Sequence, residues 1–237
     1  MVTEQLDRRA EHTRLQILQA AARQFARKPY GMVSLDDILA DAPVTKGALY
    51  FHFRSKYALA AAIIEHRTEL ADEMVKEALA RNLSGLETLI DMSCLVAAED
   101  IGDPMARACL NLVESIGRTD GLGPRVLDTW VQSFAGIAKR AVGEGDFIDA
   151  TDPESVARLL VSMYLGIRQT SDLDDPRRFL TDHERCWLLM LPGFVEPQRL
   201  GYIAQFIRRR TAVGINKATP LHPSQPGITI ASPAGPA

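Results

Sequence analysis

Residues 45–53, TKGALYFHF, concentrate side chains that can bind an anion. Lys46 carries a positive charge, Tyr50 and His52 add polar groups, and the stretch contains no acid. Gly47 leaves the backbone bare, although alanine would stabilise a helix there by up to about 1 kcal/mol. Such a helix start suits the major groove of DNA, where phosphates and base edges are within reach. Packing of Tyr50 and His52 against a preceding helix is the alternative, and the spacing alone leaves both open.

The flanking residues predict that this stretch is the second helix of a helix-turn-helix. Ser34 can cap a short helix that Pro43 ends, and Thr45 can cap the next helix only a few residues later. Two short helices joined by so tight a turn must cross steeply. Leu49 and Phe53 are four residues apart, so both can face inward.

The rest of the chain is predicted to be helical as well. Apolar residues recur at intervals of three and four, and no segment shows sustained alternation, which predicts an all-α fold without a sheet. We expect a three-helix DNA-binding domain over residues 1–56 and a larger helical domain over residues 57–210. Residues 211–237 are rich in Pro, Gly, Ala and Ser, so we expect a flexible tail there.

Charge separates the two ends of the 237-residue chain. The net charge is −3, but residues 1–56 hold nine Lys or Arg and six Asp or Glu, which leaves −6 for the remainder. A basic end on an acidic body suggests that only this end meets a polyanion. Uneven solvation charge is the alternative.

Several classes of protein are disfavoured by missing patterns. Cys94, Cys109 and Cys186 are too widely spaced for a disulfide framework or a metal knuckle, and we expect neither a metal nor a cofactor. No phosphate-binding glycine loop, Gly-x-Ser-x-Gly elbow or His-Glu-x-x-His pair is present, so we do not expect an enzyme. No apolar run reaches the roughly 18 residues of a membrane span and the start is not a secretory signal, so a cytoplasmic protein is expected.

The segment SLDDILADAPVTKGALYFHFRSKYAL resembles the DNA-binding signature of the Tet repressor family of transcriptional regulators. Pro43 stands where that family usually has glycine, and KPYG replaces the usual RGY. The resemblance implies that Lys46 and Gly47 approach the bases of an operator. It also implies a set of residues that hold phosphates: Thr45, Tyr50, His52 and Lys56.

The spelling VTKGALYFHF is similar to one branch of this family, the gamma-butyrolactone receptors of Streptomyces. This resemblance implies a repressor that binds a palindromic operator as a dimer. Release by a small diffusible gamma-butyrolactone, butenolide or furan would then control antibiotic or secondary-metabolite genes. A tryptophan on a central helix is typical of the pocket in this branch, and VLDTWVQSF places Trp130 there; Trp187 also fits the branch.

A pocket in the larger domain is the next expectation. The indole N–H of Trp130 needs a partner when buried, and Gln132 is too near along the helix to supply one. Three polar residues in apolar segments could orient a ligand: His66, Arg67 and Gln169. For these three residues a solvated face is the alternative, and for most of the apolar candidates it is a tight core. The predicted lining residues are Trp130, Phe134, Met163, Tyr164, Met92, Cys109 and Leu112.

The homodimer is expected to form through the last two long helices, ESVARLLVSMYLGI and QRLGYIAQFI, which are apolar over a wide arc. Two rival functions remain. A multidrug or antibiotic sensor of the same fold would need acids facing a wide cavity, whereas the apolar stripes here hold few acids. A ligand-independent DNA-binding adaptor would have a compact core without a cavity.

Overall fold

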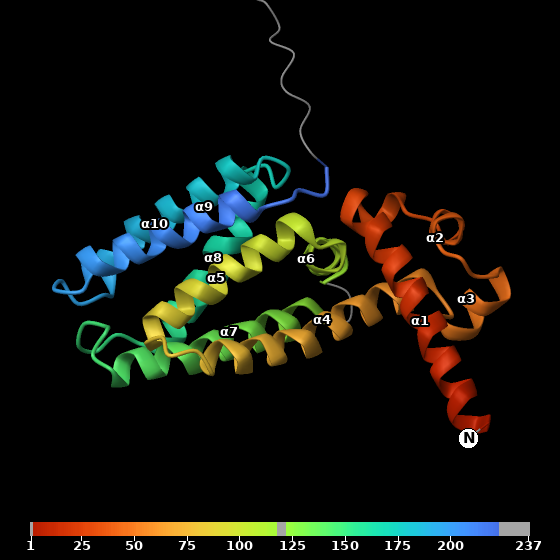
Figure 1. Ribbon diagram of the computed structural model, residues 1–237, viewed down its shortest axis with the longest axis horizontal. Coiled ribbons are helices and arrows are strands. Elements are labelled where there is room, and N and C mark those ends of the chain that lie inside the picture. Colours follow the sequence, from red (N-terminus) through yellow and green to blue (C-terminus); the bar gives the residue numbers. More distant parts are fainter. Residues whose placement is uncertain (1, 118–121, 223–237) are drawn as a thin grey trace, which may run out of the picture.

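The computed structural model describes residues 2–117 and 122–222, and almost all of their regular structure is α-helix (Figure 1). The predicted all-α class is confirmed, since pairing between extended segments in the described residues is limited to one isolated bridge, Phe147 with Val195. None of the helices in these ranges is long and apolar enough to span a membrane.

Three helices form the N-terminal head, at the right of Figure 1: α1 (Val2–Arg27), α2 (Leu35–Asp41) and α3 (Lys46–His52). The predicted caps explain where the short helices begin. Ser34 accepts a hydrogen bond from the backbone of Asp37, whose side chain bonds back to Ser34 in a capping box. Thr45 caps α3 by accepting from the backbone N–H of Ala48 at 3.2 Å. The Ser34 cap thus fixes the start of α2, and the Thr45 cap fixes the point where the tight turn enters α3.

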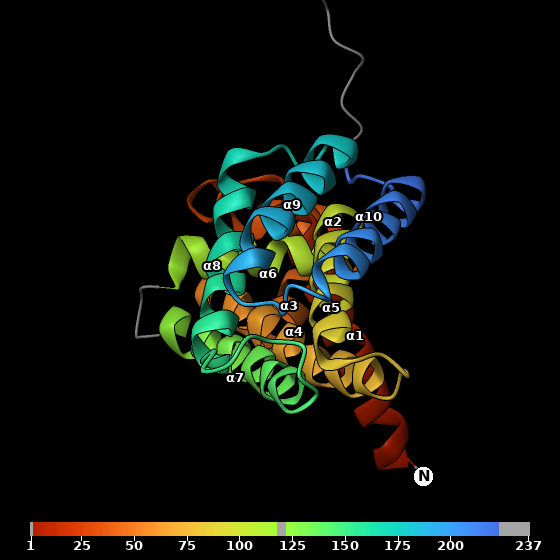
Figure 2. The same cartoon turned by 90° about the vertical axis from the view of Figure 1, so that its left-hand side faces the viewer.

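Helix α4 (Lys56–Leu79) leaves the head and runs along the lower edge of the body in Figure 1, beside α7. The body consists of α4 and six further helices: α5 (Gly85–Gly102), α6 (Pro104–Ile116), α7 (Leu122–Gly143), α8 (Pro153–Thr170), α9 (Pro176–Met190) and α10 (Leu200–Lys217). Helix α9 packs against both α8 and α10 (Figure 2). The body therefore has α4 and α7 on one side and α9 and α10 on the other.

Helix α6 joins the head to the body. One hydrophobic cluster contains buried residues of α1 such as Phe25 together with Leu112 and Val113 of α6. Helix α6 also contacts α4, α5 and α7. The head and the body thus share apolar packing through α6 as well as the covalent connection through α4.

The C-terminal boundary differs from the expected one. Helix α10 continues to Lys217, so residues 211–217 are helical rather than part of a flexible tail. Thr211 is buried and Ile215 packs on the cluster around α9, because the apolar stripe of α10 continues past Arg210. Leu221 donates its backbone N–H to Ile101 at 3.2 Å. The remainder of the expected tail, residues 223–237, lies outside the described part of the chain.

Candidate DNA-binding helix and ligand pocket

Helix α3 has one face in the core and one face open to solvent. Leu49 and Phe53 are buried, as their spacing predicted. Lys46 and Gly47 are exposed at the first turn and Tyr50 is 46% exposed, whereas His52 is half-buried. The open face therefore carries a positive charge and a phenol next to a bare stretch of backbone.

Gly47 is not required by the packing of the protein. A Cβ added there would meet only the Oγ1 atom of Thr45 at 3.9 Å, an ordinary van der Waals contact. Alanine would fit and would be the better helix former. A small residue at this place makes physical sense when an external molecule must approach the helix backbone closely.

Lys46 is held only weakly by the protein. Its ammonium lies 3.3 Å from the Oδ1 atom of Asp36 on α2, and both side chains are strongly exposed. An ion pair in such a position contributes roughly 0–1 kcal/mol because water screens it. Lys46 can therefore exchange this carboxylate for a phosphate or a base edge at little cost.

Lys56 lies differently from the expectation that it anchors a phosphate. Its ammonium donates to the backbone carbonyls of Tyr30 at 2.9 Å and Val33 at 2.8 Å. The same ammonium lies 4.3 Å from the ring centroid of Tyr30. The lysine turns inward because the segment after α1 offers two carbonyl acceptors next to an aromatic face. We therefore assign Lys56 the role of fixing the start of α4.

Phe51 is a DNA-facing candidate that the sequence pattern did not single out. Its side chain is 80% exposed and its ring lies edge-on to His52, with centroids 5.1 Å apart. Phe51 follows Gly47 by four residues, so the two share one helix face. That spacing was visible in the sequence, but apolar character argued for burial.

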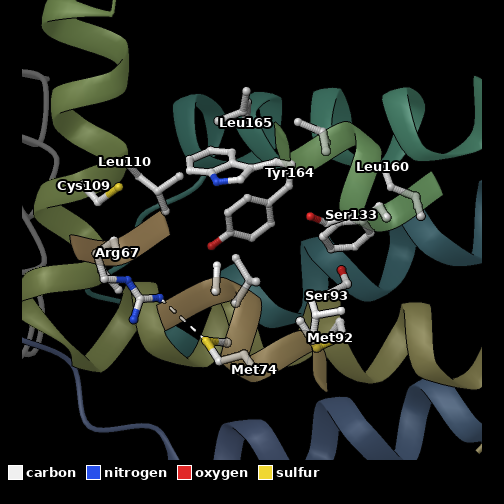
Figure 3. Close-up of a pocket in the computed structure, with 17 residues that line it drawn as sticks. Arg67, Met74, Met92, Ser93, Cys109, Leu110, Ser133, Leu160, Tyr164 and Leu165 are labelled. Atoms are coloured by element: carbon white, nitrogen blue, oxygen red, sulfur yellow. Dashed lines mark hydrogen bonds between the residues drawn. The ribbon is translucent and has the colours of Figure 1, made fainter. Parts of the chain in front are cut away.

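A cavity of about 110 Å³ lies inside the body. Helices α4 to α8 all contribute to its wall (Figure 3). The wall contains five of the seven predicted residues: Trp130, Phe134, Tyr164, Met92 and Cys109. Most of its other members are apolar too, which suits a largely apolar small molecule.

Two predicted lining residues are placed elsewhere. Leu112 packs in the cluster that α6 shares with the head, on another side of the helix from Leu110, which does line the cavity. Met163, one position before Tyr164 on α8, packs against two hydrophobic clusters that both include residues of α9. Neighbouring helical residues point about 100° apart, so an error of one or two positions changes which surface a side chain meets.

Polar groups are few but well placed around this cavity. The indole N–H of Trp130 makes no hydrogen bond to any described residue, and the side chain is only partly buried. Arg67 lines the wall and pairs with Glu99, with its Nη2 atom 2.6 Å from Oε2. The ring of Tyr164 projects toward the middle of the pocket in Figure 3. Its hydroxyl donates to Asp100, and burial followed by the charge of Asp100 raises the pKa of Tyr164 well above its usual value.

Ser93 is a lining residue that the sequence pattern did not reveal. Its hydroxyl accepts the indole N–H of Trp187 at 3.1 Å and lies 2.6 Å from Nε2 of His183. Burial lowers the pKa of His183 to about 4, so this imidazole is neutral near pH 7. Trp187 is fully buried and is not part of the wall.

Of the three polar candidates, only Arg67 lines the cavity; Gln169 is exposed and donates to Glu114.

Known proteins resemble this chain over both head and body. Residues 17–63 match the model of "Bacterial regulatory proteins, tetR family". Over 196 residues the chain is 32% identical to the A-factor receptor protein of Streptomyces griseus, covering 82% of this chain and 68% of that protein. The chain belongs to the TetR family. The matched residues 17–63 run from α1 into α4 and contain the whole of α2 and α3.

Two solved structures extend the match to the body. A gamma-butyrolactone receptor described as ArpA-like has a TM-score of 0.73 and 32% identity over 86% of this chain and 99% of its own. CprB from Streptomyces coelicolor, solved in complex with its biological operator sequence, has the same TM-score, identity and coverage. The chain is thus a TetR-family regulator related to the gamma-butyrolactone receptors, as the resemblance of VTKGALYFHF predicted.

Proposed function

We propose that this chain is a repressor that binds a palindromic operator as a dimer through α3 and is released by a small neutral autoregulator. The observation that carries the proposal is the double role of α4. Four residues of α4 lie in the pocket wall: Arg67, Ala71, Met74 and Val75. The same helix begins at Lys56, after only three residues that follow α3. A ligand that displaces α4 therefore moves the DNA-binding helix.

The head supports DNA as the partner. Lys46 and Gly47 at the start of α3 suit contact with bases, and Thr45, Tyr50 and His52 suit contact with phosphates. The relative CprB is known in complex with its operator, and the match to it covers 86% of this chain. One short helix reads only a few bases, so two heads spaced by about 34–36 Å are needed to read one palindrome.

The pocket supports a neutral oxygen-bearing ligand. Its wall contains no Asp or Glu among the described residues, and the charge of Arg67 is neutralised by Glu99. This composition disfavours a cationic drug. The unpartnered N–H of Trp130 offers one donor to a carbonyl or hydroxyl oxygen. A gamma-butyrolactone, butenolide or furan carries such an oxygen on an otherwise apolar skeleton, and the existence of a cavity disfavours a ligand-independent adaptor.

The dimer is proposed to form through α8 and α10. Apolar side chains remain exposed on both helices and on α9 between them: Leu159, Leu189, Tyr202 and Val213. Exposed apolar groups on a monomer can mark an interface. Leu159→Glu is expected to shift the protein to a monomer in light scattering. A variant that stays dimeric would move the interface away from α8.

Operator selection from random DNA tests the function as a whole. The expected result is enrichment of a palindrome that the protein binds as a dimer, followed by loss of the complex when a synthetic gamma-butyrolactone, butenolide or furan is added. Genes for antibiotic or secondary-metabolite production are the expected neighbours of that palindrome in the genome. Selection that enriches no palindrome would remove the repressor assignment.

Reciprocity provides a second test. A ligand that weakens operator binding must itself bind more weakly to the operator complex, by the same factor, and such couplings are typically 1–3 kcal/mol. Calorimetric titration of the active compound into free protein and into the operator complex measures both affinities. Equal affinities would exclude ligand release of DNA.

A further inference from the structure

A continuous line of polar contacts runs from the pocket to the head. The hydroxyl of Tyr164 donates to Oδ2 of Asp100 at 2.8 Å, and Nε of Arg168 donates to the same oxygen at 2.6 Å. Nη2 of Arg168 donates to Oδ1 of Asn111 at 2.9 Å. Nδ2 of Asn111 then donates to the carbonyl of Phe25 at 3.0 Å. Four helices, α8, α5, α6 and α1, are joined in this way.

The centre of this line is a buried ion pair. The side chain of Asp100 is fully buried and that of Arg168 is 2% exposed. Arg168 also pairs with Glu114. Removing Arg168 would leave the charge of Asp100 uncompensated away from water, so the pair holds its geometry firmly. Arg107 fixes the end of α5 by donating to the carbonyls of Asp100 at 2.8 Å and Ile101 at 2.9 Å. A displacement of Tyr164 at one end of the line therefore cannot be accommodated by a shift of Asp100 alone.

Asn111 is the member that reaches the head. Helix α1 ends at Arg27, and the carbonyls of Phe25 and Ala26 lie in its last turn, where no further helical N–H is available. The Nδ2 atom of Asn111 lies 3.0 Å from the first and 3.5 Å from the second. The same amide presents its oxygen to Arg168. One side chain thus caps α1 and contacts the buried ion pair.

We propose that Tyr164, Asp100, Arg168 and Asn111 form a relay that couples occupancy of the pocket to the position of the head. The relay rests on the proposed function, in which a ligand in this pocket releases DNA. Tyr164 senses the ligand because its ring lies in the pocket wall while its hydroxyl holds Asp100. A ligand that shifts this ring disturbs the ion pair, and Asn111 passes the change to the end of α1. This route through α6 acts beside the direct route through α4.

The variants Tyr164→Phe and Asn111→Ala break the relay at its two ends. Each is compared with the parent in the full-length protein, with a synthetic 2-acyl-gamma-butyrolactone as the probe. We measure the affinity of the probe for free protein and the operator affinity with and without probe. The factor by which the probe weakens operator binding is expected to fall at least fivefold in both variants. Probe affinity for free Asn111→Ala is expected to stay within a few-fold of the parent.

Matched controls remove a hydroxyl on α8 and on α6 without touching a side chain of the relay. Thr170→Ala deletes a hydroxyl of α8 that lies outside the pocket wall and bonds only carbonyls of its own helix. Ser115→Ala does the same one turn after Asn111 on α6. Both are expected to keep the parental coupling factor. A parental factor in a folded Asn111→Ala or Asn111→Asp protein would overturn the relay.

A second readout separates failure of the relay from failure of the proposed ligand class. Tyr164 and Asn111 do not hydrogen-bond each other. If they acted independently, the change in operator affinity of the double variant would equal the product of the two single changes within about twofold. The relay instead predicts that Tyr164→Phe has little further effect once Asn111→Ala is present. Suppose that the operator affinity of the parent shows no response to the probe while that of the double variant departs from the product of the single changes by more than about threefold. In that case the proposed ligand class is wrong and the relay stands. Multiplicative effects in probe-free protein would overturn the relay.

Discussion

Lys56 and Tyr30 form a clamp at the start of α4, in which the ammonium lies 4.3 Å from the ring centroid and 2.9 Å from the carbonyl oxygen of the same tyrosine. A second carbonyl, that of Val33, lies 2.8 Å from the ammonium. The clamp ties the first residue of α4 to the segment between α1 and α2. A movement of α4 is therefore transmitted to the head through this clamp.

Lys56→Met is expected to lower the free energy of unfolding by about 1–3 kcal/mol, because two backbone carbonyls lose a charged donor. Operator affinity should fall with the loss of order in the head, while its dependence on salt concentration should stay parental. Urea unfolding and binding titrations at several salt concentrations check both. A salt slope reduced by about one with parental stability would restore Lys56 as a phosphate contact.

Lys46→Ala also removes one lysine charge from the head and is compared with Lys56→Met. The ion pair with Asp36 is exposed, so stability should change by less than about 0.5 kcal/mol. If Lys46 reads a base, specific binding should weaken by about 1–3 kcal/mol. Titrations on the selected operator and on unrelated DNA distinguish this from loss of a phosphate contact, which would weaken both alike and lower the salt slope by about one.

Gly47→Ala separates the needs of folding from those of DNA binding. The added methyl group has room, and alanine should stabilise α3 by up to about 1 kcal/mol. Operator binding should nevertheless weaken, because the methyl group lies where the helix backbone approaches the groove. Gly136→Ala, at a helical glycine of α7 with open space around it, is the control and should leave binding unchanged. Parental operator affinity in Gly47→Ala would argue against close approach at this position.

Trp130→Ala is expected to leave operator binding intact and to remove release by the active compound. The reason is the loss of ring contact and of an N–H that no described residue engages. Trp130→Phe should keep part of the response, since only the donor is lost. Gel shifts with increasing compound measure the response. A core role predicts instead that Trp130→Ala costs about 3–5 kcal/mol of stability and that DNA binding fails with it.

His183 should make stability depend on pH. Burial lowers the pKa of its imidazole from 6.5 to about 4, so the unfolded chain takes up a proton first as the pH falls. Stability contributed by the neutral form is present above pH 6.5 and is lost between pH 6.5 and about 4. From pH 7 to pH 4 the parent should lose roughly 3 kcal/mol more than His183→Gln. Identical pH profiles for the two proteins would show that burial does not shift this histidine.

Local chemistry is readable from the sequence alone. Caps at Ser34 and Thr45, the tight turn and the inward spacing of Leu49 and Phe53 all depend on residues a few positions apart. The helical period and the motif around Lys46 therefore suffice to predict the head and its class.

Only the tertiary structure decided which distant side chains meet. The inward turn of Lys56 depends on carbonyls more than twenty residues away, and the end of α10 depends on packing against α9. Leu112 and Met163 are apolar like the true lining residues, so composition could not separate them from Leu110 and Tyr164. Ser93 contacts His183, and Asn111 contacts Phe25. A single sequence gives no indication that these distant segments lie next to each other. Helix packing brings these groups together, and it is set by the shape of the whole core rather than by any local pattern.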